Sequence, residues 1–305
     1  MMNVKLPDVS YNFGADATAE MIPERVANLA SYGVRRVMLD ASQLMKAADD
    51  LAYLHAMQNA LKNNGLVVYD AHAPHGPHDS FGFPAPEAEH LCLEKAHKAM
   101  VVAAELGAKT VTFHVDRTRR VGNMVDEFGV FEKVELEKAR SRILHQLEIV
   151  LPEAQRLGLM IALENLFLPS STAEFLASIM RGMPHPNLGL NYDSGHALLL
   201  ERQPGKKSED IAEWIRIGWD DDCVIFQDDQ LDAMLPYVIT CHIHDNRGKD
   251  DEHLLPGQGI ADWKRIVERL CLAPRLLSIQ SEVKAKCYGD DPGSQTTAFR
   301  ACGFK

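Results

Sequence analysis

A short segment near residue 245 carries two pairs of side chains that commonly bind metal ions. His242 and His244 follow the apolar run at residues 237–240, and a strand there would project both imidazoles from the same face. Asp251 and His253 come next, in a loop that ends in Pro-Gly-Gln-Gly. Imidazoles and carboxylates at the end of a buried strand are costly to desolvate unless a partner compensates them, and a divalent cation is a common partner. The segment therefore predicts a metal site where a strand runs into its loop.

Short apolar runs alternate with longer amphipathic stretches along the whole chain. The expected strands are residues 9–12, 36–40, 66–72, 110–114, 159–164, 188–193, 238–244 and 276–282. The expected helices include residues 23–32, 51–63, 88–106, 134–157, 172–181 and 262–270. This alternation predicts an α/β fold, a (β/α)₈ TIM barrel in which residues 1–305 form a single domain. A doubly wound open sheet is the alternative, but it would need fewer strands or a second domain.

Six consecutive expected strands end in a carboxylate or an imidazole. The residues at these ends are His72, His114, Glu164, Asp193, His242 and Glu282. In a (β/α)₈ barrel the C-terminal ends of the strands meet on one face, where barrel enzymes place their active sites. We therefore expect one shared metal site on that face. The imidazoles suit zinc, and a shell rich in carboxylates also suits manganese, cobalt or magnesium.

The composition narrows the class of partner and the compartment. Hydrophobic residues make up 46% of the chain and charged residues 25%, as in soluble globular proteins. The net charge of −11 repels polyanions, so we expect no nucleic acid partner. The six cysteines contain no CxxC pair, and the first residues lack the apolar region of a signal peptide. We expect a cytoplasmic protein with no membrane partner, and a homo-oligomer is an open possibility.

The segment from His242 to Trp263 resembles a known group of proteins. It reads His-Ile-His-Asp-Asn-x-Gly-x-x-Asp-Glu-His-Leu-x-Pro-Gly-x-Gly-x-x-Asp-Trp. This string is similar to the sugar phosphate isomerase/epimerase branch of the xylose-isomerase-like barrel superfamily, which also contains the ketose 3-epimerases and endonuclease IV. The resemblance runs from the first strand to about Glu282. Arg247 is a departure, because small or acidic residues are commoner at that place.

The resemblance implies a set of metal ligands. In the ketose 3-epimerases one metal ion is held by Glu, Asp, His and Glu, and the matching residues here are Glu164, Asp193, His242 and Glu282. Endonuclease IV holds three zinc ions with nine ligands. Their counterparts here add five residues to those four, namely His72, His114, His196, Asp251 and His253. The implied cofactor is therefore a divalent metal ion, Mn²⁺, Zn²⁺ or Co²⁺, in one to three copies.

The resemblance also implies a chemistry. A cation held by two neighbouring substrate oxygens lowers the cost of an enediolate, and two carboxylates can remove and return a proton on opposite faces. Glu164 and Glu282 are the matching acid/base residues. The expected activity is metal-dependent isomerisation or epimerisation of a sugar or sugar phosphate, with a small carbohydrate as the substrate. The alternatives are an endonuclease IV-like enzyme acting at abasic DNA sites and a dehydratase of a sugar-like or inositol-like compound.

Four residues are candidates for substrate binding. His196 could bind the substrate or a metal, and we expect His244 to face the substrate or to support a ligand. Arg247 could bind a substrate oxygen or phosphate, or pair with Asp250 or Asp251 on the surface. Arg117, in the basic cluster 116–120, could bind phosphate or lie in a solvated loop.

Residues in three other places are further candidates for the site. His75 and His78 supply extra imidazoles close to His72, and Tyr11 and Asn12 at the end of the first strand could line the pocket.

Overall fold

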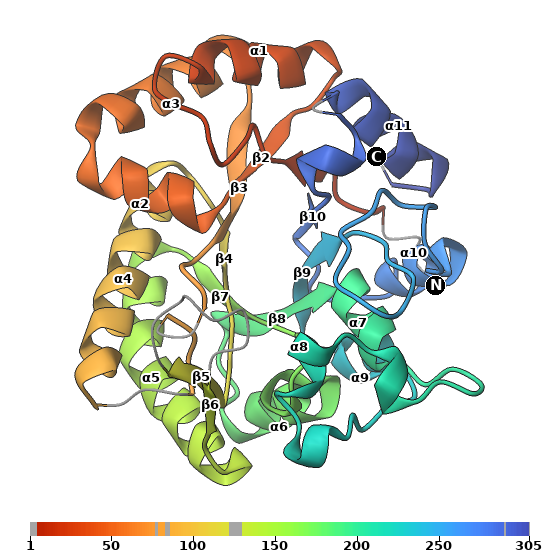
Figure 1. Ribbon diagram of the computed structural model, residues 1–305. Helices are drawn as coiled ribbons and strands as arrows, with labels where there is room; N and C mark the ends of the chain where they lie inside the picture. Colours follow the sequence, from red (N-terminus) through yellow and green to blue (C-terminus); the bar gives the residue numbers. More distant parts are fainter. Residues whose placement is uncertain (1–4, 77–78, 83–85, 122–129, 290, 305) are drawn as a thin grey trace.

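The eight expected strands close into a parallel barrel, so the predicted (β/α)₈ fold is confirmed. In the computed structural model the order of neighbouring strands is β1-β10-β9-β8-β7-β4-β3-β2, and β2 returns to β1. Figure 1 shows the strands at the centre and the helices around them. The structure describes residues 5–76, 79–82, 86–121, 130–289 and 291–304.

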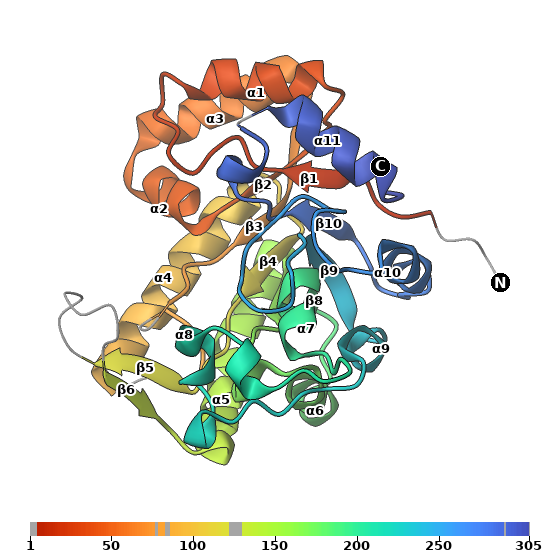
Figure 2. The same ribbon diagram turned by 45° about the vertical axis from the view of Figure 1, so that its right-hand side comes forward.

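The barrel strands match the expected ranges closely. Their bounds are β1 Val9–Tyr11, β2 Arg36–Leu39, β3 Val67–His72, β4 Thr110–Phe113, β7 Met160–Glu164, β8 Leu188–Asp193, β9 Val238–Ile243 and β10 Ser278–Ser281. A separate antiparallel pair, β5 Thr118–Val121 and β6 Val130–Lys133, follows β4 and lies at the periphery of the molecule (Figure 2). The basic cluster 116–120 therefore enters a hairpin instead of remaining a simple loop.

The six expected helices are present, together with others. The α-helices are α1 Ile22–Ser31, α2 Ala41–Asp49, α3 Leu51–Asn64, α4 Pro86–Glu105, α5 Leu136–Leu157, α6 Ala173–Gly182, α7 Ser194–Leu200, α8 Glu213–Arg216, α9 Gln230–Met234, α10 Trp263–Leu270 and α11 Pro292–Ala301. Short 3₁₀ turns lie at Pro169–Ser171, Ser208–Asp210, Asp220–Asp222 and Ala285–Cys287.

Helix ends follow local capping chemistry. Asp40 and Gln43 form a reciprocal capping box at the start of α2, which satisfies backbone donors that would otherwise lack a partner. Gly65 and Gly158 end α3 and α5 in the left-handed conformation, with φ of 65° and 70°. The two glycine caps turn the chain from α3 into β3 and from α5 into β7.

The barrel interior is polar near the site and beneath it. Asp193 pairs with His242, and His242 pairs with Gln280 across β8, β9 and β10. Paired positions in neighbouring strands share a face of the sheet, so these side chains project to the same side. The hydrophobic core lies mainly between the strands and the surrounding helices, and it includes Val111 and Ile161.

Residues 198–235 contain a small second core. Leu199, Leu200, Ile211, Ile215, Trp219 and Val224 pack together there. The partly buried side chain of Phe167 packs against this apolar cluster. Among the described helices, none is both long enough and apolar enough to cross a membrane.

Candidate metal centre

Glu164, at the end of β7, lies among four imidazoles. Its Oε2 is 3.2 Å from Nε2 of His72 and 3.1 Å from Nε2 of His114. Its Oε1 is 3.1 Å from Nδ1 of His242 and 3.4 Å from Nδ1 of His196. Imidazoles from β3, β9, helix α7 and the residue after β4 thus direct their ligating atoms at one buried carboxylate.

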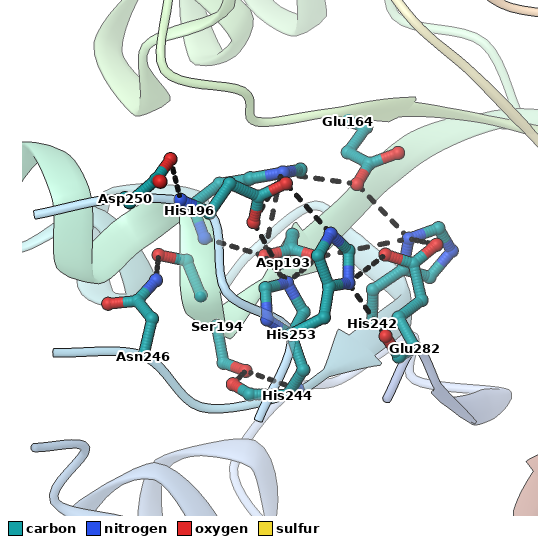
Figure 3. A network of polar contacts seen from close by, with 12 residues as sticks. Glu164, Asp193, Ser194, His196, His242, His244, Asn246, Asp250, His253 and Glu282 are labelled. Atoms are coloured by element: carbon teal, nitrogen blue, oxygen red, sulfur yellow. Dashed lines mark hydrogen bonds and ion pairs between the residues drawn. The ribbon is translucent and has the colours of Figure 1, made fainter. Parts of the chain in front are cut away.

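The other expected primary ligands meet at His242. Its Nδ1 is 2.8 Å from Oε1 of Glu282 and 4.0 Å from Oδ2 of Asp193, in addition to the contact with Glu164. Ligands that share one ion at bonds of about 2.0–2.6 Å lie about 3–4 Å from one another. The spacing of these four residues fits a shared ion. Figure 3 shows them converging from different strands.

A second group of ligating atoms lies next to the first. Asp251 contacts His253 through Oδ2 at 2.8 Å, and its Oδ1 is 3.7 Å from Nε2 of His196. His244 approaches the same Oδ1 to 3.9 Å. The nine residues predicted as ligands therefore form one connected set, and His244 lies within it.

The turn after β8 positions His196 and His244. Asp193 caps α7 by accepting a hydrogen bond from the backbone N–H of His196 at 2.7 Å, which places that imidazole above the strand end. Ser194 donates to the backbone oxygen of His244 at 2.7 Å. A Cβ on Gly195 would lie only 1.9 Å from Cε1 of His244, so the His244 ring requires glycine there.

The loop that carries Asp251 and His253 is held by a buried carboxylate. Asp245 accepts hydrogen bonds from the backbone of Gly257 and from Nε1 of Trp263, at 3.0 and 3.1 Å. His253 itself has a φ of 53°, a conformation that few non-glycine residues adopt. Such local strain persists where the surrounding structure enforces it, often at functional sites.

The electrostatics of the site balance negative carboxylates against imidazoles. Burial raises the pKa of Glu164, but the neighbouring His242 and His114 outweigh burial and hold that pKa well below its usual range. Burial lowers the pKa of His242, yet Glu164 and Glu282 raise it well above the ordinary value. The carboxylates are therefore ionised. Protonated imidazoles or metal ions can supply the positive charge that balances them.

His75 is a further imidazole close to these ligands. The charge on His114, burial and His72 together lower the pKa of His75 to about 3. Its ring lies 4.9 Å from that of His72 and 4.6 Å from that of His114. His75 is thus a neutral group in the site, whereas His78 lies outside the described residues.

The donor set fits divalent ions of the first transition row. Two groups of four residues each hold their ligating atoms within 4.8 Å of one another: His72, Glu164, His242 and Glu282, and His196, His244, Asp251 and His253. Oδ1 of Asp251 is buried and lacks a hydrogen-bond partner in the described part of the chain. Buried, ionised carboxylates grouped with imidazoles are typical ligands of zinc, manganese and cobalt.

A cavity of about 590 Å³ opens over the site. His72, His114, Glu164, His196, Asp251 and Glu282 contribute to its floor. The cavity is also lined by residues that are not among the candidates predicted from the sequence, including Met38, Asp40, Phe167, Lys284 and Tyr288. Phe167 follows the predicted ligand Glu164 by three positions, and Lys284 follows Glu282 by two. Their closeness in sequence to predicted ligands is the feature from which they could be predicted.

The two candidates at the end of the first strand, Tyr11 and Asn12, lie in different surroundings. Asn12 lines the cavity. Tyr11 is buried in the core, with its ring 5.6 Å from that of Phe299.

The four residues predicted to bind substrate lie in different surroundings. His196 lines the cavity, and His244 is buried with Nε2 3.1 Å from Asp193. Arg117 is buried and donates to Asp220 at 2.8 Å. Arg247 forms an ion pair with Glu252 instead of the expected Asp250 or Asp251. Both guanidinium groups point at carboxylates, and their contact with substrate stays a prediction.

Comparisons with known proteins agree with this fold. A family model described as xylose isomerase-like TIM barrel matches residues 26–273. The chain is 30% identical over 121 residues to the uncharacterized protein MJ1311 of Methanocaldococcus jannaschii, a match that covers 38% of this chain and 34% of that protein. It is 29% identical over 172 residues to the uncharacterized protein y4fM of Sinorhizobium fredii, covering 55% of this chain and 45% of that protein. The match thus spans less than half the length of either relative.

Solved structures match over nearly the whole chain. A D-tagatose 3-epimerase-like protein has a TM-score of 0.67 at 17% identity, covering 97% of this chain and 98% of its own. The apo form of the 3-keto-D-glucoside 4-epimerase YcjR from E. coli has a TM-score of 0.66 at 16% identity, with coverages of 98% and 100%. A xylose isomerase-like TIM barrel protein from Mycobacterium smegmatis in complex with magnesium has a TM-score of 0.65 at 15% identity, with coverages of 98% and 97%. At these identities the likeness shows a shared fold.

Proposed function

The chain belongs to the xylose isomerase-like TIM barrel family, and on that premise we propose that it is a divalent-metal-dependent isomerase or epimerase of a sugar or a closely related polyhydroxy carbonyl compound. The observation that carries the proposal is the convergence of Glu164 and Glu282 on Nδ1 of His242, at 3.1 and 2.8 Å, beneath the cavity. Two ionised carboxylates beside one imidazole can serve both as ligands and as acid/base groups.

Glu164, Asp193, His242 and Glu282 would hold the principal ion. His72, His114, His196, Asp251 and His253 would hold up to two more, and the pairing of Glu164 with His72 and His114 supports that extension. A divalent cation, when bound, supplies positive charge to the substrate oxygens on which negative charge develops. Mn²⁺, Co²⁺ and Zn²⁺ all suit this donor set.

Glu282 and Glu164 are the proposed acid/base pair. One carboxylate removes the proton from the carbon next to the substrate carbonyl, and the other returns a proton to the opposite face of that carbon. Both residues line the cavity, so each can reach a bound substrate. Figure 3 shows the two carboxylates approaching His242 from different directions, which supports an exchange between two faces.

The cavity wall supports a small carbohydrate substrate. The side chains proposed to bind metal, which are polar, cover the floor of the cavity, while Met38, Leu166 and Phe167 give its wall an apolar surface. Sugar rings present both hydroxyl groups and apolar C–H faces, so a pocket with both characters suits them. Two of the matched structures are of an epimerase or an epimerase-like protein, which is consistent with this class of substrate.

The second cluster of ligands favours a rival function. His196, His244, Asp251 and His253 could hold an additional ion, as in a metal-dependent nuclease that cleaves a phosphodiester. The net charge of −11 opposes DNA binding, and Arg117 and Arg247 are each paired with a carboxylate. A dehydratase acting on a similar substrate would use the same base, and product analysis separates it from an epimerase.

Solvent-proton exchange tests the proposal. The metal-loaded protein is incubated in D₂O with ketohexoses, their phosphates and 3-keto glycosides, and deuterium incorporation and products are followed by NMR. Glu282→Gln is expected to lower exchange by about 10²–10⁴-fold, because it removes an acid/base group and keeps the size of the side chain. Glu268→Gln is the matched control, since Glu268 is exposed on α10.

Two results would count against the assignment. Exchange that survives in Glu282→Gln would show that another residue is the base. Cleavage of abasic DNA at physiological salt, lost in the same variant and accompanied by no exchange into any carbohydrate, would favour the nuclease.

A further inference from the structure

His242 presents two different environments to its two ring nitrogens. Nδ1 faces the carboxylates of Glu164 and Glu282. Nε2 is buried, and no described residue forms a hydrogen bond with it. If Nδ1 binds a cation with its lone pair, the ring proton must lie on Nε2, and this buried N–H then needs an acceptor.

Gln280 offers an acceptor at the same level of the barrel. It pairs with His242 across β9 and β10, so both side chains project from the same face of the sheet. Gln280 is fully buried, and its Oε1 has no hydrogen-bond partner in the described part of the structure. A buried N–H and a buried carbonyl oxygen, each without a partner, therefore occupy neighbouring positions.

A chain of hydroxyl groups determines which way the Gln280 amide faces. Asp70 is fully buried and accepts hydrogen bonds from Ser10 and Thr110, each at 2.7 Å, and a third from Ser278. Because a hydroxyl has one proton, Ser278 uses its proton on Asp70. Oγ1 of Thr240, 2.8 Å from Oγ of Ser278, must then be the donor in that contact.

The lone pair of Thr240 is consequently left to accept a hydrogen bond. Nε2 of Gln280 donates to Oγ1 of Thr240 at 3.4 Å. The amide nitrogen is thereby committed to Thr240, and Oε1 is the part of the side chain that remains available. The network that begins at Asp70 thus keeps the carbonyl end of Gln280 free for His242.

Asn191 is the competing acceptor. Both atoms of its side-chain amide are buried without a partner among the described residues. Across β8 and β9, however, Asn191 pairs with Thr240, whereas Asp193 pairs with His242. Asn191 therefore lies one inward position below His242, and Gln280 lies level with it.

We infer that Gln280 is a positioning residue for His242, with its Oε1 accepting the Nε2–H proton through a small rotation of the amide or one bridging water. This inference rests on the proposed function, in which His242 is a metal ligand. Gln280 then holds the imidazole in the tautomer that leaves Nδ1 unprotonated toward the metal. Asp70 acts further away, through Ser278 and Thr240, by orienting the amide.

Cobalt binding tests the inference without using activity. Wild type, Gln280→Met and Gln280→Glu are titrated with Co²⁺ in competition with a chelator, and the visible d–d spectrum is recorded. Gln280→Met removes the acceptor at similar volume, so Co²⁺ affinity should fall by about 10- to 100-fold, the usual effect of losing a partner of a ligating histidine. Gln280→Glu keeps an oxygen acceptor for Nε2–H but loses the amide N–H that donates to Thr240, so its Co²⁺ affinity should exceed that of Gln280→Met and its spectrum should match that of the wild type.

Thr112→Val is the matched control, because it removes another buried hydroxyl without a described partner from the same barrel. It should leave Co²⁺ affinity and spectrum unchanged.

Wild-type affinity in Gln280→Met overturns the inference and leaves the proposed function standing. An equal loss of Co²⁺ affinity in Thr112→Val also overturns it. A loss of Co²⁺ affinity in Asn191→Leu without any loss in Gln280→Met overturns it too, because Asn191 would then be the acceptor. If Gln280→Met fails to fold, Gln280→Leu replaces it, and wild-type Co²⁺ affinity in that variant overturns the inference. Failure of the wild type to bind Co²⁺ overturns both proposals.

Discussion

His244 lies flat against His253, with ring centroids 3.9 Å apart and 12° between the ring planes. Nε2 of His244 also lies 3.1 Å from Asp193 and 3.9 Å from Asp251. This one buried imidazole therefore lies beside the carboxylates of two predicted ligands, Asp193 and Asp251. The sequence predicts a supporting or substrate-facing position for His244, and its complete burial favours the supporting one.

The first prediction concerns Gly195, which makes room for His244. Gly195→Ala would place a Cβ 1.9 Å from Cε1 of the ring, so the imidazole has to move away from Asp193. We expect the free energy of unfolding to fall by about 1–3 kcal/mol, the usual cost of overpacking a core. Chemical denaturation of the metal-free protein measures this cost, and Zn²⁺ titration should show weaker binding as well.

Gly182→Ala is the control for that substitution. A Cβ on Gly182 would meet only the flexible end of Arg140, at 3.3 Å, and alanine favours the helical backbone of α6. Its stability should match or exceed that of the wild type. Equal behaviour of Gly195→Ala and Gly182→Ala would show that His244 is not held as tightly as the geometry indicates.

The second prediction separates the two ligand groups. Asp251 contacts His253 and lies near His196 and His244, and among the described residues no hydrogen bond or ion pair joins it to Glu164 or Glu282. Asp251→Asn should therefore lower the metal content at saturating Zn²⁺ by about one equivalent while an ion remains at the Glu164 group, because a neutral amide is a weaker ligand than a carboxylate. Elemental analysis after dialysis measures the change.

Asp250→Asn is a close control, because Oδ1 of Asp250 accepts from Nε1 of Trp214 at 3.0 Å and from the backbone N–H of Asp251 at 2.8 Å, and asparagine keeps an oxygen acceptor there. Its metal content should equal that of the wild type. An unchanged zinc content in Asp251→Asn would mean that the second group binds no ion.

Much of the barrel could be predicted from the sequence, because the apolar runs that form the strands end in the residues that can bind a metal. Glu164, Asp193 and His242 each end an apolar run, and the parallel fold brings such ends together. Helix α2 was not expected, because it begins directly after β2 and depends on a capping box between Asp40 and Gln43. A local hydrogen bond of this kind leaves little trace in hydrophobic periodicity.

Other parts of the site depend on tertiary contacts that spacing does not encode. Phe167 lines the cavity because the second core holds its loop, and its backbone oxygen accepts from Nε1 of Trp219 at 2.9 Å. Gln280 precedes Glu282 by two residues, yet its hydrogen bond to Thr240 and the link onward to Asp70 exist only once the barrel has closed. A sequence pattern can indicate which face such a residue occupies, but it cannot identify its partner.

The third prediction concerns the central carboxylate. Glu164 contacts His72, His114, His196 and His242, so Glu164→Gln leaves a group of buried imidazoles without their main negative partner. We expect the metal-free variant to lose about 3–5 kcal/mol of stability, as when one partner of a buried ion pair is removed. Denaturant titration at constant pH measures the loss.

The same variant should also lose stabilisation by metal. In the wild type, an ion at 100 times its dissociation constant should add about 2.7 kcal/mol to the free energy of unfolding, because it binds only the folded state. Glu164→Gln should show little of this gain, whereas the exposed Glu268→Gln should show all of it. A full gain in Glu164→Gln would remove Glu164 from the ligand set.

The last prediction concerns the apolar wall of the cavity. The ring of Phe167 lies 5.3 Å from that of His196 and 4.9 Å from that of Trp214, in edge-to-face contact with both. Phe167→Leu removes aromatic surface beside a ligand and leaves the acid/base residues in place. We expect KM for the substrate to rise by about tenfold, equivalent to about 1.4 kcal/mol of binding, with kcat within a few-fold of the wild type.

Phe226→Leu distinguishes loss of substrate contact from loss of packing. Phe226 packs against the same second core but does not line the cavity, so both variants should lose a similar amount of stability. Only Phe167→Leu should change KM. Equal KM values in the two variants would show that Phe167 serves the second core alone, and a fall in kcat at constant KM would place it in the positioning of His196 instead.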